Sequence, residues 1–159
     1  MILAHDDYWH TVNDLHTPFL AAAIARPLLD RRDIRNSARV GEALVFAYVS
    51  GRTLKSLFRE RRPGGGGNDS FPSGHAATAF AVATMDAALY PREAPFWLGG
   101  AALLSVARNE IGVHYFADVV GGAALGYGLG RLLVRYPNGL VIAPLFREGA
   151  RGVSLTMRF

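Results

Sequence analysis

Residues 68–80 read Asn-Asp-Ser-Phe-Pro-Ser-Gly-His-Ala-Ala-Thr-Ala-Phe, which places a histidine at the start of an alanine-rich run. A serine directly before an apolar run is typical of a helix N-cap. The N-terminus of a helix presents unpaired N–H groups and the positive end of the helix dipole, and together these bind anions such as phosphate. Ser73, Gly74 and His75 therefore indicate either a phosphate site or an ordinary capped helix, and the rest of the chain has to decide between them.

Outward from this stretch, apolar segments alternate with turn residues such as Pro63 with its four following glycines, and Pro91. These patterns predict helices over residues 11–29, 34–61, 74–89, 94–106 and 114–135. After Pro137, alternating apolar runs predict a β-hairpin. We therefore expect an all-α fold, an antiparallel bundle of five to six helices over residues 1–139. A C-terminal β-hairpin over residues 140–159 is expected to pack on it as an appendage of the same domain.

The composition narrows the classes of partner. A chain of 159 residues is most simply one domain, and without cysteine it has neither disulfides nor thiolate chemistry. Seventeen Lys and Arg against 13 Asp and Glu favour anionic partners, namely phosphate esters, a membrane surface or nucleic acid. Lys55 is the only lysine, which singles out its ammonium group as a candidate ligand for an anion.

No signal peptide is visible, because the first ten residues contain two aspartates and two histidines. None of the apolar runs reaches the roughly 18 uncharged residues that mark a transmembrane helix. The run over residues 119–134 comes nearest, and Arg131 interrupts it. We expect a soluble helical core, while the positive mean hydropathy of +0.16 leaves open a membrane protein with short or tilted spans.

A stripe of basic residues precedes the glycine-rich loop. Arg52, Lys55, Arg59 and Arg62 are spaced three, four and three residues apart, so they share one face if the helix over 34–61 runs through them. Such a stripe is usually a solvated surface. Here it leads directly into the loop before Ser73, which can fold the end of the helix and the Ser-Gly-His turn onto one anion.

A second histidine lies four residues before an aspartate. If the last helix begins near residue 114, His114 and Asp118 lie side by side on its first turn. A carboxylate there can accept the proton of one ring nitrogen and leave the other nitrogen free as a nucleophile. Seen singly, such residues are more often a core histidine and a helix-start acid. His5, His10 and His16 lie in a polar N-terminal stretch and receive no role.

The last predicted helix carries small residues at helical spacing. Gly122, Gly126 and Gly130 are four residues apart, which predicts a face that lets another backbone approach closely. This pattern concerns packing rather than chemistry. It suits a bundle in which His114 lies within reach of the helix that carries His75.

Three blocks now stand in order: Lys55 with Arg62-Pro63, then Pro72 to His75, then Arg108 with His114 and Asp118. Together they resemble the signature of the type 2 phosphatidic acid phosphatase superfamily. That superfamily also contains bacterial non-specific acid phosphatases and vanadium haloperoxidases. The chain departs from the pattern at Ala107, where the family usually has serine, and we expect a modest loss from the missing hydroxyl.

The resemblance implies a role for each residue. His114 would attack phosphorus and become a phosphohistidine while Asp118 holds its ring, and His75 would protonate the leaving group and then activate water. The phosphate oxygens would be bound by Lys55, Arg62, Arg108 and the N–H groups near Ser73 and Gly74. The scheme needs no metal and no other cofactor.

The function expected from the sequence is a metal-independent phosphomonoesterase acting on phosphate or diphosphate esters, either of lipids or of small soluble molecules. Two alternatives stay open: a vanadium-dependent haloperoxidase, which the short chain disfavours, and a non-catalytic phosphate-binding bundle. We expect association with a membrane surface and no binding of nucleic acid. A periplasmic or membrane-associated location in a bacterium is favoured, and the sequence predicts no oligomeric state.

Overall fold

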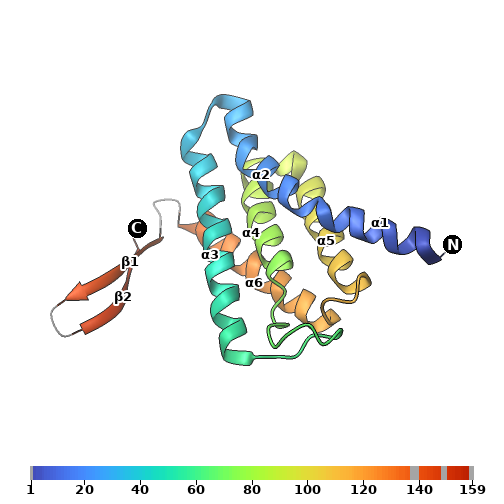
Figure 1. Cartoon of the computed structure of the whole chain (residues 1–159). Coiled ribbons are helices and arrows are strands. Elements are labelled where there is room, and N and C mark those ends of the chain that lie inside the picture. Colours follow the sequence, from blue (N-terminus) through green and yellow to red (C-terminus); the bar gives the residue numbers. More distant parts are fainter. Residues whose placement is uncertain (1, 137–139, 148–149, 158–159) are drawn as a thin grey trace.

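The structure is a computed structural model that describes residues 2–136, 140–147 and 150–157. Within these ranges the chain is predominantly helical, as predicted, and the helices form a bundle (Figure 1). The elements in chain order are α1 (Ile2–Asp14), α2 (His16–Arg31), α3 (Ile34–Phe58), α4 (Gly74–Leu89), a 3-10 turn (Pro91–Glu93), α5 (Ala94–Glu110), α6 (Phe116–Arg135), β1 (Leu140–Arg147) and β2 (Ala150–Met157).

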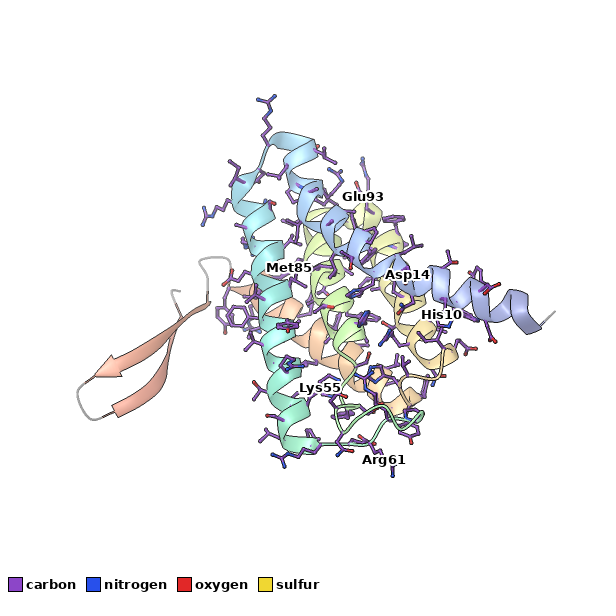
Figure 2. The ribbon with its side chains drawn as sticks, viewed as in Figure 1. His10, Asp14, Lys55, Arg61, Met85 and Glu93 are labelled. Atoms are coloured by element: carbon purple, nitrogen blue, oxygen red, sulfur yellow. The ribbon has the colours of Figure 1, made fainter. Side chains whose placement is uncertain are left out.

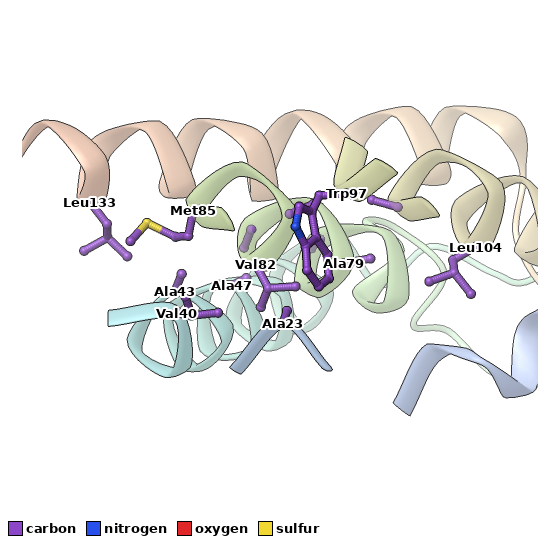
Figure 3. Close-up of a cluster of buried hydrophobic side chains, with 14 of the residues drawn as sticks. Ala23, Val40, Ala43, Ala47, Ala79, Val82, Met85, Trp97, Leu104 and Leu133 are labelled. Atoms are coloured by element: carbon purple, nitrogen blue, oxygen red, sulfur yellow. The ribbon is translucent and has the colours of Figure 1, made fainter. Parts of the chain in front are cut away.

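Helix α4 is the centre of the bundle. It packs against α2, α3, α5 and α6, and almost every residue from Ala76 to Asp86 is buried. Its many alanine side chains allow neighbouring helices to approach on several sides, which explains why its apolar pattern has no polar stripe. Figure 3 shows the resulting core, in which α4 supplies Ala79, Val82 and Met85, and the other helices supply Val40, Ala43, Ala47, Trp97, Leu104 and Leu133.

The backbones of α4 and α6 touch through the predicted glycine face. A Cβ atom on Gly122 would lie 2.3 Å from the carbonyl oxygen of Ser73, and one on Gly126 would lie 2.1 Å from that of Ala77. Both helices advance by four residues between these contacts, so this packed pair runs parallel and not antiparallel. The N-termini of α4 and α6 therefore lie at the same end of the bundle.

Two helix ends differ from the predicted ones for local reasons. Helix α3 ends at Phe58, because Arg59 adopts a left-handed conformation with φ of 48°. Arg59 and Arg62 therefore lie outside the helix, and the predicted four-residue basic stripe is not a helix face. Helix α6 begins at Phe116 and not at residue 114, because the backbone N–H of Tyr115 donates to the side chain of Asp118.

The N-terminal residues form a helix that the sequence analysis did not predict. Helix α1 covers Ile2–Asp14, and α2 follows after a single residue, Leu15, whereas the sequence predicted one helix over residues 11–29. Strands β1 and β2 pair antiparallel, with Leu140 opposite Met157 and Arg147 opposite Ala150. In Figure 1 these strands project away from the helices, whereas the sequence analysis expected them to pack on the bundle.

The contact between α4 and α6 predicts a sharp difference between two glycine substitutions on one helix. In Gly126→Ala the new methyl group meets a backbone oxygen, so we expect the free energy of unfolding to fall by about 1–3 kcal/mol. Gly128→Ala is the matched control, since its Cβ would have no atom within 4 Å, and we expect a gain of about 0.5–1 kcal/mol. Denaturant titrations followed by circular dichroism measure both, and equal stability of the two variants would contradict the packing described.

Candidate active site

The three sequence blocks meet at a cleft of about 510 Å³. Its walls come from α2, α3, the loop after α3, the start of α4, the end of α5 and the loop before α6. Figure 2 shows Lys55 near the end of α3, close to the loop that leads to α4. Six of the eight predicted site residues line this cleft: Lys55, Arg62, Gly74, His75, Arg108 and His114.

His114 is held by a buried carboxylate at the edge of this cleft. Its side chain is only 2% exposed, and Nδ1 lies 3.3 Å from Oδ2 of the fully buried Asp118. The same carboxylate oxygen accepts hydrogen bonds from the hydroxyl of Ser70 and, at 2.9 Å, from the backbone N–H of Tyr115. Because Asp118 is fixed from three directions, it orients the imidazole and leaves Nε2 as the ring nitrogen without this partner.

The backbone around His114 is fixed by the end of α5. The N–H of His114 donates to the carbonyl of Arg108 at 3.2 Å, and the side-chain amide of Asn109 donates to the carbonyl of His114 at 3.1 Å. His114 thus lies in a loop just before α6, so it is not on the first helical turn as predicted. The predicted contact between His114 and Asp118 is nevertheless present, because the loop folds back over the start of the helix.

His114 is electrostatically suited to be a neutral base or nucleophile. Burial, together with the nearby cations of Lys55 and Arg108, lowers its pKa to about 4. The hydrogen bond to Asp118 acts in the opposite direction but is the weaker influence. At neutral pH the ring is therefore uncharged, and its second nitrogen carries a lone pair.

His75 occupies the first turn of α4 and faces the cleft. Its pKa is lowered to about 3, first by burial, then by the nearby ring of His16 and by the cations of Arg108 and Arg62. The sequence alone did not give the sign of this shift. A bound phosphate dianion would oppose these cations and raise the pKa of His75, which favours the protonated ring when an anion is present.

Lys55 and Arg62 both tie the loop after α3 to the site. The ammonium of Lys55 donates to the backbone carbonyl of Asp69 and, at 3.2 Å, to that of Ser70. Arg62 makes two hydrogen bonds to the carboxylate of Asp69, at 2.8 and 3.0 Å. This pairing holds the pKa of Asp69 below its ordinary value. The sequence analysis missed Asp69 and Ser70, although both stand between two recognised blocks.

Arg108 is oriented by a residue of α1, Asn13. Its Nη1 donates to Oδ1 of Asn13 at 2.7 Å. Its Nε is buried and has no hydrogen-bond partner among the described residues. The guanidinium is thus fixed at one corner and keeps an unused donor. The neighbouring Ala107, where the family usually has serine, is fully buried in the apolar core.

Ser73 has a different place from the one predicted. It is fully buried and does not line the cleft, and its side chain makes no N-cap hydrogen bond. Its backbone N–H donates to the carbonyl of Asp118 at 2.9 Å, so this donor is already occupied. The start of α4 reaches the cleft through Gly74 and His75 instead. Ser73 serves to join the N-termini of α4 and α6.

A metal site was not predicted from the sequence. Across residues 2–136 and the two described strands, no three histidine or carboxylate side chains gather in a way that would hold a metal ion. Independence from metals remains a prediction, which treatment with a chelator tests.

The comparison with known families matches the PAP2 superfamily over residues 40–141. The chain belongs to the PAP2 superfamily. The matched range contains all three blocks, from Lys55 to Asp118, and it agrees with the resemblance seen in the sequence. Helices α1 and α2, which supply Asn13 and His16, lie outside that range.

Two bacterial proteins illustrate the likeness to curated relatives. The chain is 35% identical over 113 residues to a lipid A 1-phosphatase of Porphyromonas gingivalis, a match that covers 63% of this chain and 25% of that protein. It is 40% identical over 58 residues to a lipid A 1-phosphatase of Rhizobium etli, covering 36% of this chain and 25% of that protein. The chain thus spans about a quarter of the length of the curated relatives it matches.

Two crystal structures share the fold. LpxE of Aquifex aeolicus superposes with a TM-score of 0.69 at 25% sequence identity, over 82% of this chain and 86% of LpxE. A transmembrane PAP2-type phosphatidylglycerolphosphate phosphatase of Bacillus subtilis gives a TM-score of 0.58 at 22% identity, over 84% and 76% of the two chains. The arrangement of the helices is therefore that of solved PAP2 proteins.

The protonation of His114 can be measured directly. We expect nuclear magnetic resonance of the labelled imidazole to give a pKa near 4, so that the ring is neutral at pH 6. In Lys55→Met the pKa should rise, because one of the cations that disfavour the imidazolium is removed. Titration of His114 at its ordinary value near 6.5, in both proteins, would contradict the electrostatics described.

Proposed function

We propose that this protein is a phosphatase that hydrolyses phosphate or diphosphate esters of lipids, without a metal ion, through a phosphohistidine on His114. The observation that carries the proposal is the pairing of His114 with the buried carboxylate of Asp118 at the edge of a cationic cleft. Membership of the PAP2 superfamily and the named activities of the relatives support the same reaction class.

In the first step Nε2 of His114 attacks phosphorus as the bond from phosphorus to the ester oxygen breaks. The Nδ1–H group stays hydrogen bonded to Asp118, which stabilises the charge that the ring acquires. His75, protonated in the presence of the substrate dianion, gives its proton to the leaving oxygen. General acid catalysis of this kind contributes about 10²–10⁴ in rate.

In the second step a water molecule attacks phosphorus and the bond from phosphorus to nitrogen breaks. His75, now neutral, takes the proton of that water and is ready for the next cycle. Lys55, Arg62 and Arg108 would bind the phosphate oxygens in both steps, together with the free N–H groups at the start of α4. The positive ends of two helix dipoles add to this field, since α4 and α6 begin side by side.

The shape of the cleft supports a lipid rather than a small soluble ester. Beyond the cationic end the cleft is walled by Leu20 of α2 and by Leu44, Val45 and Tyr48 of α3. At 1.5 Å per residue, Leu44 lies about 16 Å along the helix from Lys55. An acyl chain can follow this wall while its phosphate lies among the cations.

Exposed apolar side chains support contact with a membrane. On α3, α5 and α6 they include Val49, Leu57, Phe58, Phe96, Leu103, Phe116 and Val120. Among the described helices only α6 is long and apolar enough to cross a bilayer, and a third of its apolar window is buried in the bundle. We place the enzyme in association with a bacterial membrane, with the reaction confined to the helical domain and the hairpin as its appendage.

Steady-state hydrolysis tests the proposed reaction. We expect the protein to release phosphate from a lipid phosphate in mixed micelles, with activity that survives EDTA and is inhibited by orthovanadate. His114→Ala should lower kcat by several orders of magnitude, because the nucleophile is lost. Circular dichroism of the variant is the control for folding.

Two results would overturn the proposal. Full activity of a folded His114→Ala variant would exclude His114 as the nucleophile. Absence of phosphatase activity, together with vanadate-dependent oxidation of bromide by peroxide, would show the haloperoxidase instead.

The apolar wall predicts a second, separate result. In Val45→Asp we expect KM for a long-chain lipid phosphate to rise about 10- to 100-fold, because contact worth roughly 1.5–3 kcal/mol is replaced by a charge. Hydrolysis of a small chromogenic phosphate should stay unchanged. Ile34→Asp is the matched control, since Ile34 is also exposed on α3 but does not line the cleft. Equal effects of the two variants would place the lipid elsewhere.

A further inference from the structure

The junction between α1 and α2 contacts two residues of the proposed active site. Asn13 and His16 lie on either side of this junction and outside the range matched to the PAP2 superfamily. One contacts Arg108 at the end of α5, and the other contacts His75 at the start of α4. Figure 2 shows Asp14 at this junction, where α1 leads into α2 in front of the bundle.

His16 stacks on the ring of His75. The ring centroids are 4.1 Å apart, with an angle of 36° between the planes. In the described part of the chain no hydrogen bond reaches the nitrogens of His75, so this stacking is the ring contact that restrains it. Without it the imidazole could turn about its side-chain bonds and leave the position from which it must reach the leaving oxygen.

A hydrogen bond fixes His16 itself. Its Nε2 lies 3.0 Å from the hydroxyl oxygen of Thr78, and that hydroxyl donates its own proton to the carbonyl of Gly74 at 2.9 Å. When the hydroxyl proton is used in this way, the tautomer that completes the hydrogen bond carries its hydrogen on Nε2 of His16 and donates it to Thr78. Burial lowers the pKa of His16 to about 4, so the ring stays neutral. A neutral aromatic ring can stack favourably on a protonated His75.

Asn13 restrains the guanidinium of Arg108, just as His16 restrains the imidazole of His75. Its Oδ1 accepts from Nη1 of Arg108 at 2.7 Å, and the buried Nε of Arg108 has no partner among the described residues. A neutral amide orients the cation without cancelling its charge, unlike the carboxylate of Asp69 on Arg62. The charge of Arg108 therefore remains available to phosphate.

We propose that Asn13 and His16 are positioning residues of the active site, His16 for the general acid His75 and Asn13 for the phosphate-binding Arg108. The inference rests on the proposed function, because it assigns these contacts a part in that reaction. Helices α1 and α2 then complete the site, and they do so from a part of the chain where sequence motifs gave no indication.

The dependence of kcat/KM on the leaving group separates positioning from general stability. An aryl phosphate with an acidic leaving group has little need of a general acid, whereas an alkyl phosphate needs one. In His16→Ala we expect kcat/KM for the alkyl phosphate to fall at least tenfold more than for the aryl phosphate. His16→Phe should recover most of this loss, because it retains an aromatic ring against His75.

Asn13→Ala should act on binding, since it frees the guanidinium of Arg108 to turn away. We expect KM for both substrates and the inhibition constant of orthovanadate to rise about tenfold, while their kcat ratio stays as in the wild type. His10→Ala is the matched control, an exposed histidine on α1 that lies outside the cleft. Thermal unfolding of each variant shows that the fold is intact.

Equal losses for the two substrates in folded His16→Ala would overturn the role of His16, and unchanged inhibition by vanadate would overturn that of Asn13. Failure of the proposed function gives a different result, since the wild-type protein would then hydrolyse neither substrate. A wild-type enzyme that is active, with His16 and Asn13 variants indistinguishable from His10→Ala, would reject this inference alone.

Discussion

The direct backbone contact between α4 and α6 is the constraint on which the rest of the structure depends. The glycines of α6 remove the side chains that would keep the two helices apart, and the contacts at Gly122 and Gly126 fix a parallel arrangement. The hydrogen bond from Ser73 to the carbonyl of Asp118 joins the two helix starts. His75 begins one helix and His114 precedes the other, so the packing of glycines sets the distance between the two histidines.

The electrostatic design follows from that geometry. Two helix N-termini and four cationic side chains lie around one cleft, and they would repel each other without an anion. The chain offsets part of this cost locally, with Asp69 on Arg62, backbone carbonyls on Lys55 and an amide on Arg108. These partners are mostly neutral, so the cleft keeps a positive field. The same field and the burial of the rings keep His114 unprotonated, which is the state that a nucleophile needs.

The sequence was sufficient for the parts of the fold and site that depend on local pattern. The range of α4 was predicted to the residue, and six of eight site residues line one cleft. The end of α3 was missed, because a left-handed Arg59 leaves no signal in composition. The start of α6 was also predicted two residues too early, because the hydrogen bond from the N–H of Tyr115 to the side chain of Asp118 sets where the helix begins.

Residues that act through tertiary contacts could not be found in this way. His16 reaches Thr78 across 62 positions, and Asn13 reaches Arg108 across 95. No spacing rule links such residues, and a polar N-terminal stretch looks the same whether or not it packs on a site. Ser70 could more easily have been predicted as a site residue, because it lies three residues before Ser73. Its hydrogen bond to Asp118, however, depends on how the loop folds.

Capture of the covalent intermediate tests the central claim most directly. The protein would be mixed with a radiolabelled phosphate ester, quenched in alkali within one turnover and digested, and the labelled peptide identified by mass spectrometry. The account predicts an acid-labile, alkali-stable phosphate on His114. With an aryl phosphate, whose acidic leaving group needs little general acid, His75→Ala should hold more label, because the attacking water is no longer activated. Label on another residue, or turnover by wild-type protein with no label on His114, would contradict it.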